Sequence, residues 1–185
     1  MKTWVSWLMI ALTSLSACST QSSSISTRES PPERLKNEFQ TLLDLSRQGD
    51  PEPVRLKLEE FLPRAELVQS ILRASPQTEG LGELYEKQIK QSALKELPIA
   101  LIEAHKLGLK EIKISRVSPQ SGSTNAPGDL ELLEYLNDRE GLYTVRLVSP
   151  THPKGLRLNA WLHLGNRGWI SLLKLGEHIA YRSHP

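Results

Sequence analysis

Hydrophobic residues recur at helical spacing through the first half of the chain beyond residue 32. Residues 33–47 place apolar side chains three or four positions apart, and the same spacing returns in three later segments before Gly108. An apolar stripe with a period near 3.6 residues predicts an amphipathic helix. We therefore expect about four helices over residues 33–108, with Pro98 kinking or breaking the last of them.

The period changes to two after residue 108. Three segments alternate apolar and polar side chains as half-buried strands do: 110–117, 142–149 and 155–164. Gly165-Asn166-Arg167-Gly168 is typical of a tight hairpin turn and predicts a returning strand at 169–175. The pattern predicts one α+β domain, residues 33–185. Helices (33–108) pack on a mostly antiparallel sheet of about four strands in the C-terminal half (109–185).

Residues 129–137 fit two secondary structures. Leu130, Leu133 and Leu136 suit one face of a short helix capped by Asp129. An edge strand of the same length is compatible with the same residues. We favour the helix and keep the strand as the alternative.

The first 17 residues have the organisation of a secretory signal peptide. Lys2 precedes an apolar run, and small residues then lead to Cys18, the only cysteine. Leu15-Ser16-Ala17-Cys18 resembles the lipobox of bacterial lipoproteins. The resemblance implies cleavage before Cys18 and attachment of lipid to its sulfur. With Ser19 following, it also implies a place in the cell envelope, on the periplasmic side of the outer membrane where the organism has one.

An uncleaved transmembrane helix is the alternative to a cleaved signal. Residues 4–17 would rise only about 21 Å as a helix, which is short of a hydrocarbon core of roughly 30 Å. Residues 18–32 are rich in serine and nearly free of apolar side chains, so we expect them to form a disordered tether. The predicted organisation is a signal peptide (1–17), a lipidated tether (18–32) attached to a membrane, and the folded domain.

Composition and motifs argue against several function classes. The formal net charge is +2 at pH 7, without the strong basic stripe of nucleic-acid-binding proteins. A single cysteine forms no internal disulfide, and the five histidines lack metal-binding spacing. We find no glycine-rich phosphate loop and no Gly-x-Ser-x-Gly motif. We therefore expect no metal, no other cofactor and no nucleic-acid partner, and favour a non-enzymatic role.

One group of polar and aromatic side chains on the predicted sheet forms a candidate binding face. If Leu156, Leu158 and Leu162 are buried, strict alternation places the side chains between them on the opposite face, together with one arginine of the preceding strand. Arginine and aromatic side chains are typical of recognition surfaces. The predicted face consists of Arg146, Arg157, Asn159, Trp161 and His163. A solvated sheet face without a partner is the plain alternative.

Two functions and one inactive role are compatible with this pattern. The first is a membrane-tethered envelope module that binds a protein or an anionic envelope polymer through this face. The second rests on Gly155–Gly176, including Gly168-Trp169, which is similar to NTF2-like domains and implies a bent sheet and helices around a pocket. Trp161 and His163 would then face a cavity that binds a small ligand, or His163 would serve as an acid or base. The four helical segments before the first strand depart from the order of elements in NTF2-like domains. The third alternative is a spacer or assembly factor without any binding site.

Overall fold

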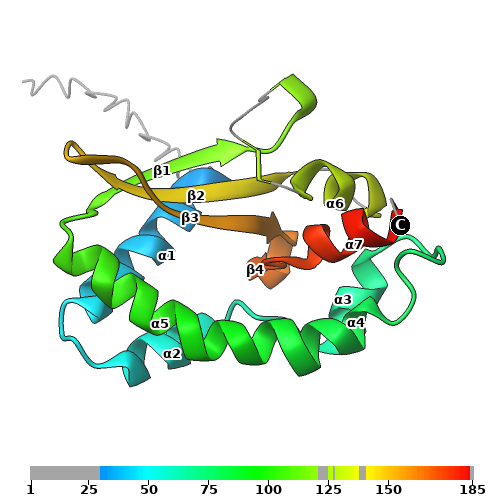
Figure 1. Cartoon of the computed structure of the whole chain (residues 1–185), viewed down its shortest axis with the longest axis horizontal. Coiled ribbons are helices and arrows are strands. Elements are labelled where there is room, and N and C mark those ends of the chain that lie inside the picture. Colours follow the sequence, from blue (N-terminus) through cyan, green and yellow to red (C-terminus); the bar gives the residue numbers. More distant parts are fainter. Residues whose placement is uncertain (1–29, 121–124, 127, 138–140, 184–185) are drawn as a thin grey trace, which may run out of the picture.

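The computed structural model describes most of the chain beyond the predicted tether. The described residues are 30–120, 125–126, 128–137 and 141–183. The predicted signal peptide and most of the predicted tether, including Cys18, lie outside them. The described part confirms the α+β prediction, because helices dominate its first half and a four-stranded antiparallel sheet its second. Figure 1 shows the sheet lying over α2 and α5, with α6 and α7 grouped at one end.

The helices before the sheet follow the predicted hydrophobic pattern. They are α1 (Pro31–Ser46), α2 (Pro51–Glu59), α3 (Ala65–Ile71), α4 (Leu81–Leu84), the π-helix η1 (Tyr85–Lys90) and α5 (Gln91–Lys106). Asp50 caps α2, since its carboxylate accepts a hydrogen bond of 2.9 Å from the Glu52 N–H. Pro98 lies inside α5, which runs on to Lys106, so the chain does not break there. None of the described helices is long and apolar enough to cross a membrane.

The strands pair in the order in which they occur in the chain. They are β1 (Glu111–Arg116), β2 (Leu142–Ser149), β3 (His152–His163) and β4 (Trp169–Ser171). Every neighbouring pair is antiparallel, as predicted. The predicted hairpin turn between β3 and β4 is present as a short 3₁₀ turn, η3 (Gly165–Arg167), with positive φ at Gly165 and Gly168.

The segment that fitted both a helix and a strand forms a helix, α6 (Asp129–Tyr135), between β1 and β2. Its N-cap is Gly128 and not Asp129, which corrects the predicted cap. Gly128 has a φ of +81°, and a Cβ there would overlap the backbone of Gly176 at the start of the last helix. Glycine is required at this position by both its conformation and the available space.

The C-terminal part of the sheet is shorter than the predicted strand over 169–175. β4 ends at Ser171, and the chain turns at Leu173, which has a left-handed φ of +46°, into a helix that was not predicted. This helix, α7 (Leu175–Ser183), buries Ile179 against the core. The returning strand is therefore only three residues long.

The core forms two clusters that meet at the sheet. The first covers what we call the inner face of the sheet and packs it against α1, α2 and α5; its sheet residues include Val145, Leu147, Leu158 and Trp161. The second cluster gathers α3, η1, α6 and α7 around the ends of the last strands; its sheet residues include Leu142, Ala160, Leu162 and Ile170. The opposite side of the sheet is called the outer face, and away from α6 and α7 it carries mostly polar residues, with Val148 as a buried apolar one.

Candidate binding face on the sheet

A bulge in β3 decides where the predicted site residues lie. Tyr143 of β2 is paired with Trp161, and Val145 with Leu158, so two steps along β2 match three along β3. One extra residue in a strand moves every later side chain to the other face. Ala160 lies in this bulge with a φ of +58°, a left-handed conformation that alanine rarely adopts.

Trp161 lies in the core, which corrects its predicted place on the exposed face. Its ring is fully buried on the inner face. The ring centroid lies 4.8 Å from that of Phe39 and 5.5 Å from that of Phe61, both in edge-to-face geometry. Because the bulge reverses the alternation, the tryptophan joins Leu158 on the inner face.

His163 follows the same reversal and also leaves the predicted face. It is partly buried, and its ring centroid lies 5.0 Å from that of Trp169. It lines an open cleft together with Arg34 of α1 and Asn166 of the hairpin turn. The inward orientation of Trp161 and His163 is the one that the pocket hypothesis requires, although Phe39 and Phe61 pack against the Trp161 ring.

Arg146, Arg157 and Asn159 precede the reversal and lie together on the outer face. Arg146 is directly opposite Arg157 in the pairing of β2 with β3. Lys113 of β1 is directly opposite Arg146 on the other side. We call Lys113, Arg146 and Arg157 the cation row. Since neighbouring strands are about 4.8 Å apart, the row crosses three strands over roughly 10 Å.

Lys113 is the site residue that the sequence reasoning missed. The signal was present in the alternating segment 110–117, because Lys113 lies between the apolar Ile112 and Ile114 and alternation turns it to the opposite face. What the sequence did not provide was the register that places Lys113 beside Arg146. Asn159, at the end of the face next to the bulge, is partly buried, and its Oδ1 has no hydrogen-bond partner among the described residues.

Local contacts hold the cation row in place without removing most of its charge. An Arg146 N–H donates to the carbonyl of Lys154 at 2.7 Å, and an Arg157 N–H donates to the carbonyl of Asn125 at 3.4 Å. Carbonyl groups orient a guanidinium group but do not neutralise it. The Lys113 ammonium group lies 3.4 Å from the Glu111 carboxylate, an exposed pair of small energetic weight.

Asp129 supplies a buried carboxyl group near the row. It accepts hydrogen bonds from the Ala126 N–H at 2.8 Å and from the Thr144 hydroxyl at 3.4 Å. Burial raises the pKa of Asp129, and the hydrogen bond from Ala126 and the positive charge of Arg157 offset part of that increase. Asp129 therefore links the loop before α6 to the outer face of the sheet.

The arrangement can bind anions but shows no metal centre. In the described ranges, no three His, Cys, Asp or Glu side chains gather in a way that could hold a metal ion. Comparisons with protein-family models, with curated proteins and with solved structures found no match to this chain.

Proposed function

We propose that this protein is a lipid-anchored module of the cell envelope that binds an anionic polymer through the cation row. The observation that carries the proposal is the register of Lys113, Arg146 and Arg157 across three adjacent strands. Two guanidinium groups and one ammonium group on a rigid sheet form a preorganised surface for carboxylate or phosphate groups.

The position of Trp161 favours a polymer over a folded protein as the partner. Protein–protein hot spots are enriched in tryptophan, tyrosine and arginine. Burial of Trp161 in the core removes the aromatic anchor that the sequence placed on this face. What remains is a row of charged side chains next to the exposed Ser115 of β1. Such a surface suits repeated anionic groups better than an apolar protein patch.

The proposed anchor rests on the resemblance of Leu15-Ser16-Ala17-Cys18 to a lipobox. Helix α1 begins at Pro31, about 13 residues beyond Cys18. A chain of that length spans at most about 45 Å when fully extended. Lipid chains on Cys18 would therefore keep the cation row close to the membrane surface, where envelope polymers are available.

The binding proposal is tested by neutralising the row in the full-length chain. We expect Lys113→Gln, Arg146→Gln and Arg157→Gln together to weaken binding to polyglutamate and polyphosphate at least about tenfold, and to flatten its salt dependence. The matched control changes three exposed lysines on helices, Lys36, Lys87 and Lys106, to Gln and removes the same charge. The measurement is a binding isotherm at several salt concentrations, with circular dichroism to confirm folding.

Two outcomes would contradict this proposal. Equal binding by the row variant and the control variant would show that the row is not the site. Binding to vesicles with anionic lipids, with no binding to either polymer, would show that the partner is a membrane surface.

The anchor is tested separately by mass spectrometry of the processed protein. We expect Cys18 as the first residue, with a mass increase that corresponds to attached lipid. We also expect Cys18→Ser to release the protein from the membrane fraction. An unmodified sulfur, or a different first residue, would overturn the anchor while leaving the binding proposal intact.

A further inference from the structure

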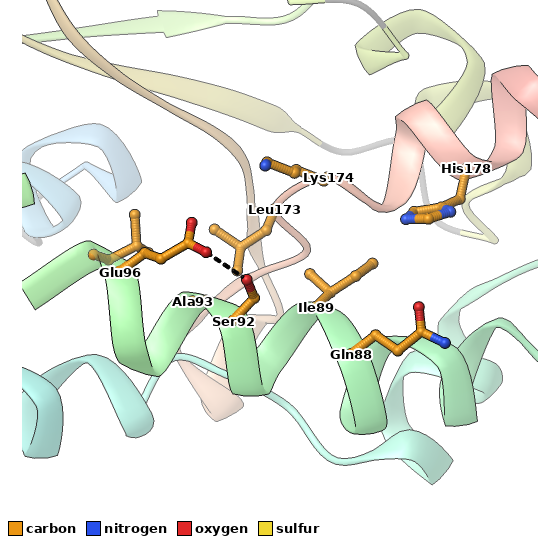
Figure 2. Close-up of a pocket in the computed structure, with 9 residues that line it drawn as sticks. Gln88, Ile89, Ser92, Ala93, Glu96, Leu173, Lys174 and His178 are labelled. Atoms are coloured by element: carbon orange, nitrogen blue, oxygen red, sulfur yellow. Dashed lines mark hydrogen bonds between the residues drawn. The ribbon is translucent and has the colours of Figure 1, made fainter.

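A pocket lies away from the cation row, between the helical rod of η1 and α5 and the connection from β4 to α7. Its volume is about 230 Å³. Figure 2 shows side chains of the helical rod forming one wall, and Leu173, Lys174 and His178 forming the other. The sheet face and its proposed polymer do not involve these residues, so the pocket is a separate feature.

Small side chains on the helical wall leave the space that forms the pocket. Ser92 and Ala93 stand at the middle of the helical wall, one turn beyond Ile89 and one turn before Glu96 and Leu97. Residues four apart on a helix lie on one face, so the wall consists of an apolar row beside a polar row. The apolar row forms the floor, and Ile89 and Ala93 are buried there.

Both walls depart from regular backbone geometry at the pocket. The helical wall begins as a π-helix, η1, whose Ile89 lines the pocket. The opposite wall turns at Leu173, a leucine with a left-handed φ of +46°. Irregular turns of these two kinds are found preferentially at functional sites. Here they shape the two sides of one pocket.

The polar groups on the rim include one positive group without an ion pair among the described residues, the Lys174 ammonium group. Glu96 accepts a hydrogen bond of 2.8 Å from the Ser92 hydroxyl, as Figure 2 shows. Lys174 lies across the pocket from these two residues. His178 of α7 lines the same side of the pocket, and Figure 2 shows the Lys174 side chain extending away from its ring. Lys174 therefore gives the wall opposite the helix a positive group that can bind an anion.

We propose that this pocket binds a small amphiphilic anion, namely a short aliphatic chain that ends in a carboxylate. The chain lies on Ile89, Ala93 and Leu173, and the carboxylate accepts a hydrogen bond from the Lys174 ammonium group at the rim. One water molecule occupies roughly 30 Å³ of liquid, so the pocket holds about eight non-hydrogen atoms. Hexanoate has this size.

The proposal is tested by NMR titration of the full-length chain, with methyl signals of Ile89, Ala93 and Leu173 as local probes. Hexanoate is compared with hexan-1-ol, which keeps a six-carbon chain without the charge, and with acetate, which keeps the charge without the chain. We expect saturable shifts of these methyl signals with hexanoate, binding at least about tenfold weaker with hexan-1-ol, and no saturable shifts with acetate.

Two variants make the assignment specific. Ala93→Leu fills the pocket and should abolish the shifts of Ile89 and Leu173. Lys174→Gln changes an exposed side chain, so the fold is retained, and should weaken hexanoate binding about tenfold. Lys106→Gln, an exposed lysine further along α5, is the control and should bind as the unmodified chain does.

Three outcomes would overturn the proposal. The first is an absence of saturable shifts with hexanoate in the unmodified chain. The second is equal binding of hexanoate and hexan-1-ol, which would make the site purely apolar. The third is unchanged hexanoate binding by Lys174→Gln.

Discussion

The two halves of β3 look alike in sequence but direct their side chains in opposite ways. In the first half, Arg157 points outward and Leu158 inward, as alternation predicts. In the second half Trp161 points inward, and Leu162 joins the cluster around α6 and α7. The apolar residues continue at every second position through both halves, so nothing in the pattern marks the change. Alternation assigns a face only as far as the next bulge.

The helices that cover the sheet explain why the reversal of side-chain direction at the bulge is tolerated. Before the bulge, α1, α2 and α5 cover the inner face, and the outer face carries the cation row. After the bulge, α6 and α7 cover the outer side as well, so Leu162 and Trp161 are both buried although they point in opposite directions. Where both faces are buried, hydrophobicity no longer distinguishes them.

Replacing Trp161 should give the largest difference between the two halves. We expect Trp161→Ala to lower the free energy of unfolding by about 3–5 kcal/mol, because it empties a buried site between Phe39 and Phe61. The measurement is urea unfolding followed by circular dichroism. Arg157→Ala, on the outer face of the first half, is the control and should change the free energy by less than about 1 kcal/mol. A mild effect of Trp161→Ala would mean that its ring is exposed, as the sequence suggested.

Most of the architecture could be predicted because its signals are local. The helical period over residues 33–108, the cap at Asp50 and the hairpin turn at Gly165–Arg167 all follow from neighbouring residues. Helix α7 could not be predicted with the same ease. It has only two fully buried apolar side chains, Leu175 and Ile179, and it follows directly on a hydrophobic strand.

The candidate site was predictable only in part. Alternation identified Arg146 and Arg157, since they lie where the strands are regular. Trp161 and His163 were placed wrongly because a bulge depends on contacts between distant strands, which no local pattern shows. The cation row depends on the pairing of β1 with β2, so its third member, Lys113, became visible only in the folded chain.

Asp129 offers a way to examine the outer face next to the bulge. Its folded pKa lies above its ordinary value of 3.8, with burial as the main cause. A carboxyl group of this kind favours folding most at pH values below 3.8, and that contribution is lost as the pH rises through the folded pKa. We therefore expect the stability of the unmodified chain, relative to Asp129→Asn, to fall as the pH rises from about 3.5 to 7.

The measurement is urea unfolding of both chains across this range, in which the other carboxyl groups cancel from the difference. Thr144 and Ala126 can still donate hydrogen bonds to the asparagine oxygen, so the fold is retained. A difference that is constant with pH, or one that grows in favour of the unmodified chain as the pH rises, would show that the carboxyl group is not buried in the way described.

The smallest expected effect gives the most direct test of the bulge itself. In a regular strand, replacing a buried alanine with glycine costs about 1.5 kcal/mol, from lost backbone restriction and one lost methyl group. Ala160 has a φ of +58°, a left-handed conformation that costs a non-glycine residue about 1–2 kcal/mol and glycine almost nothing. The two contributions nearly cancel, so Ala160→Gly should change the free energy of unfolding by less than about 0.5 kcal/mol.

Ala160→Val should lower the free energy of unfolding by more than about 2 kcal/mol, because a β-branched side chain tolerates positive φ poorly. If glycine instead costs about 1.5 kcal/mol and valine is accepted, the strand is regular at this position, and Trp161 returns to the outer face.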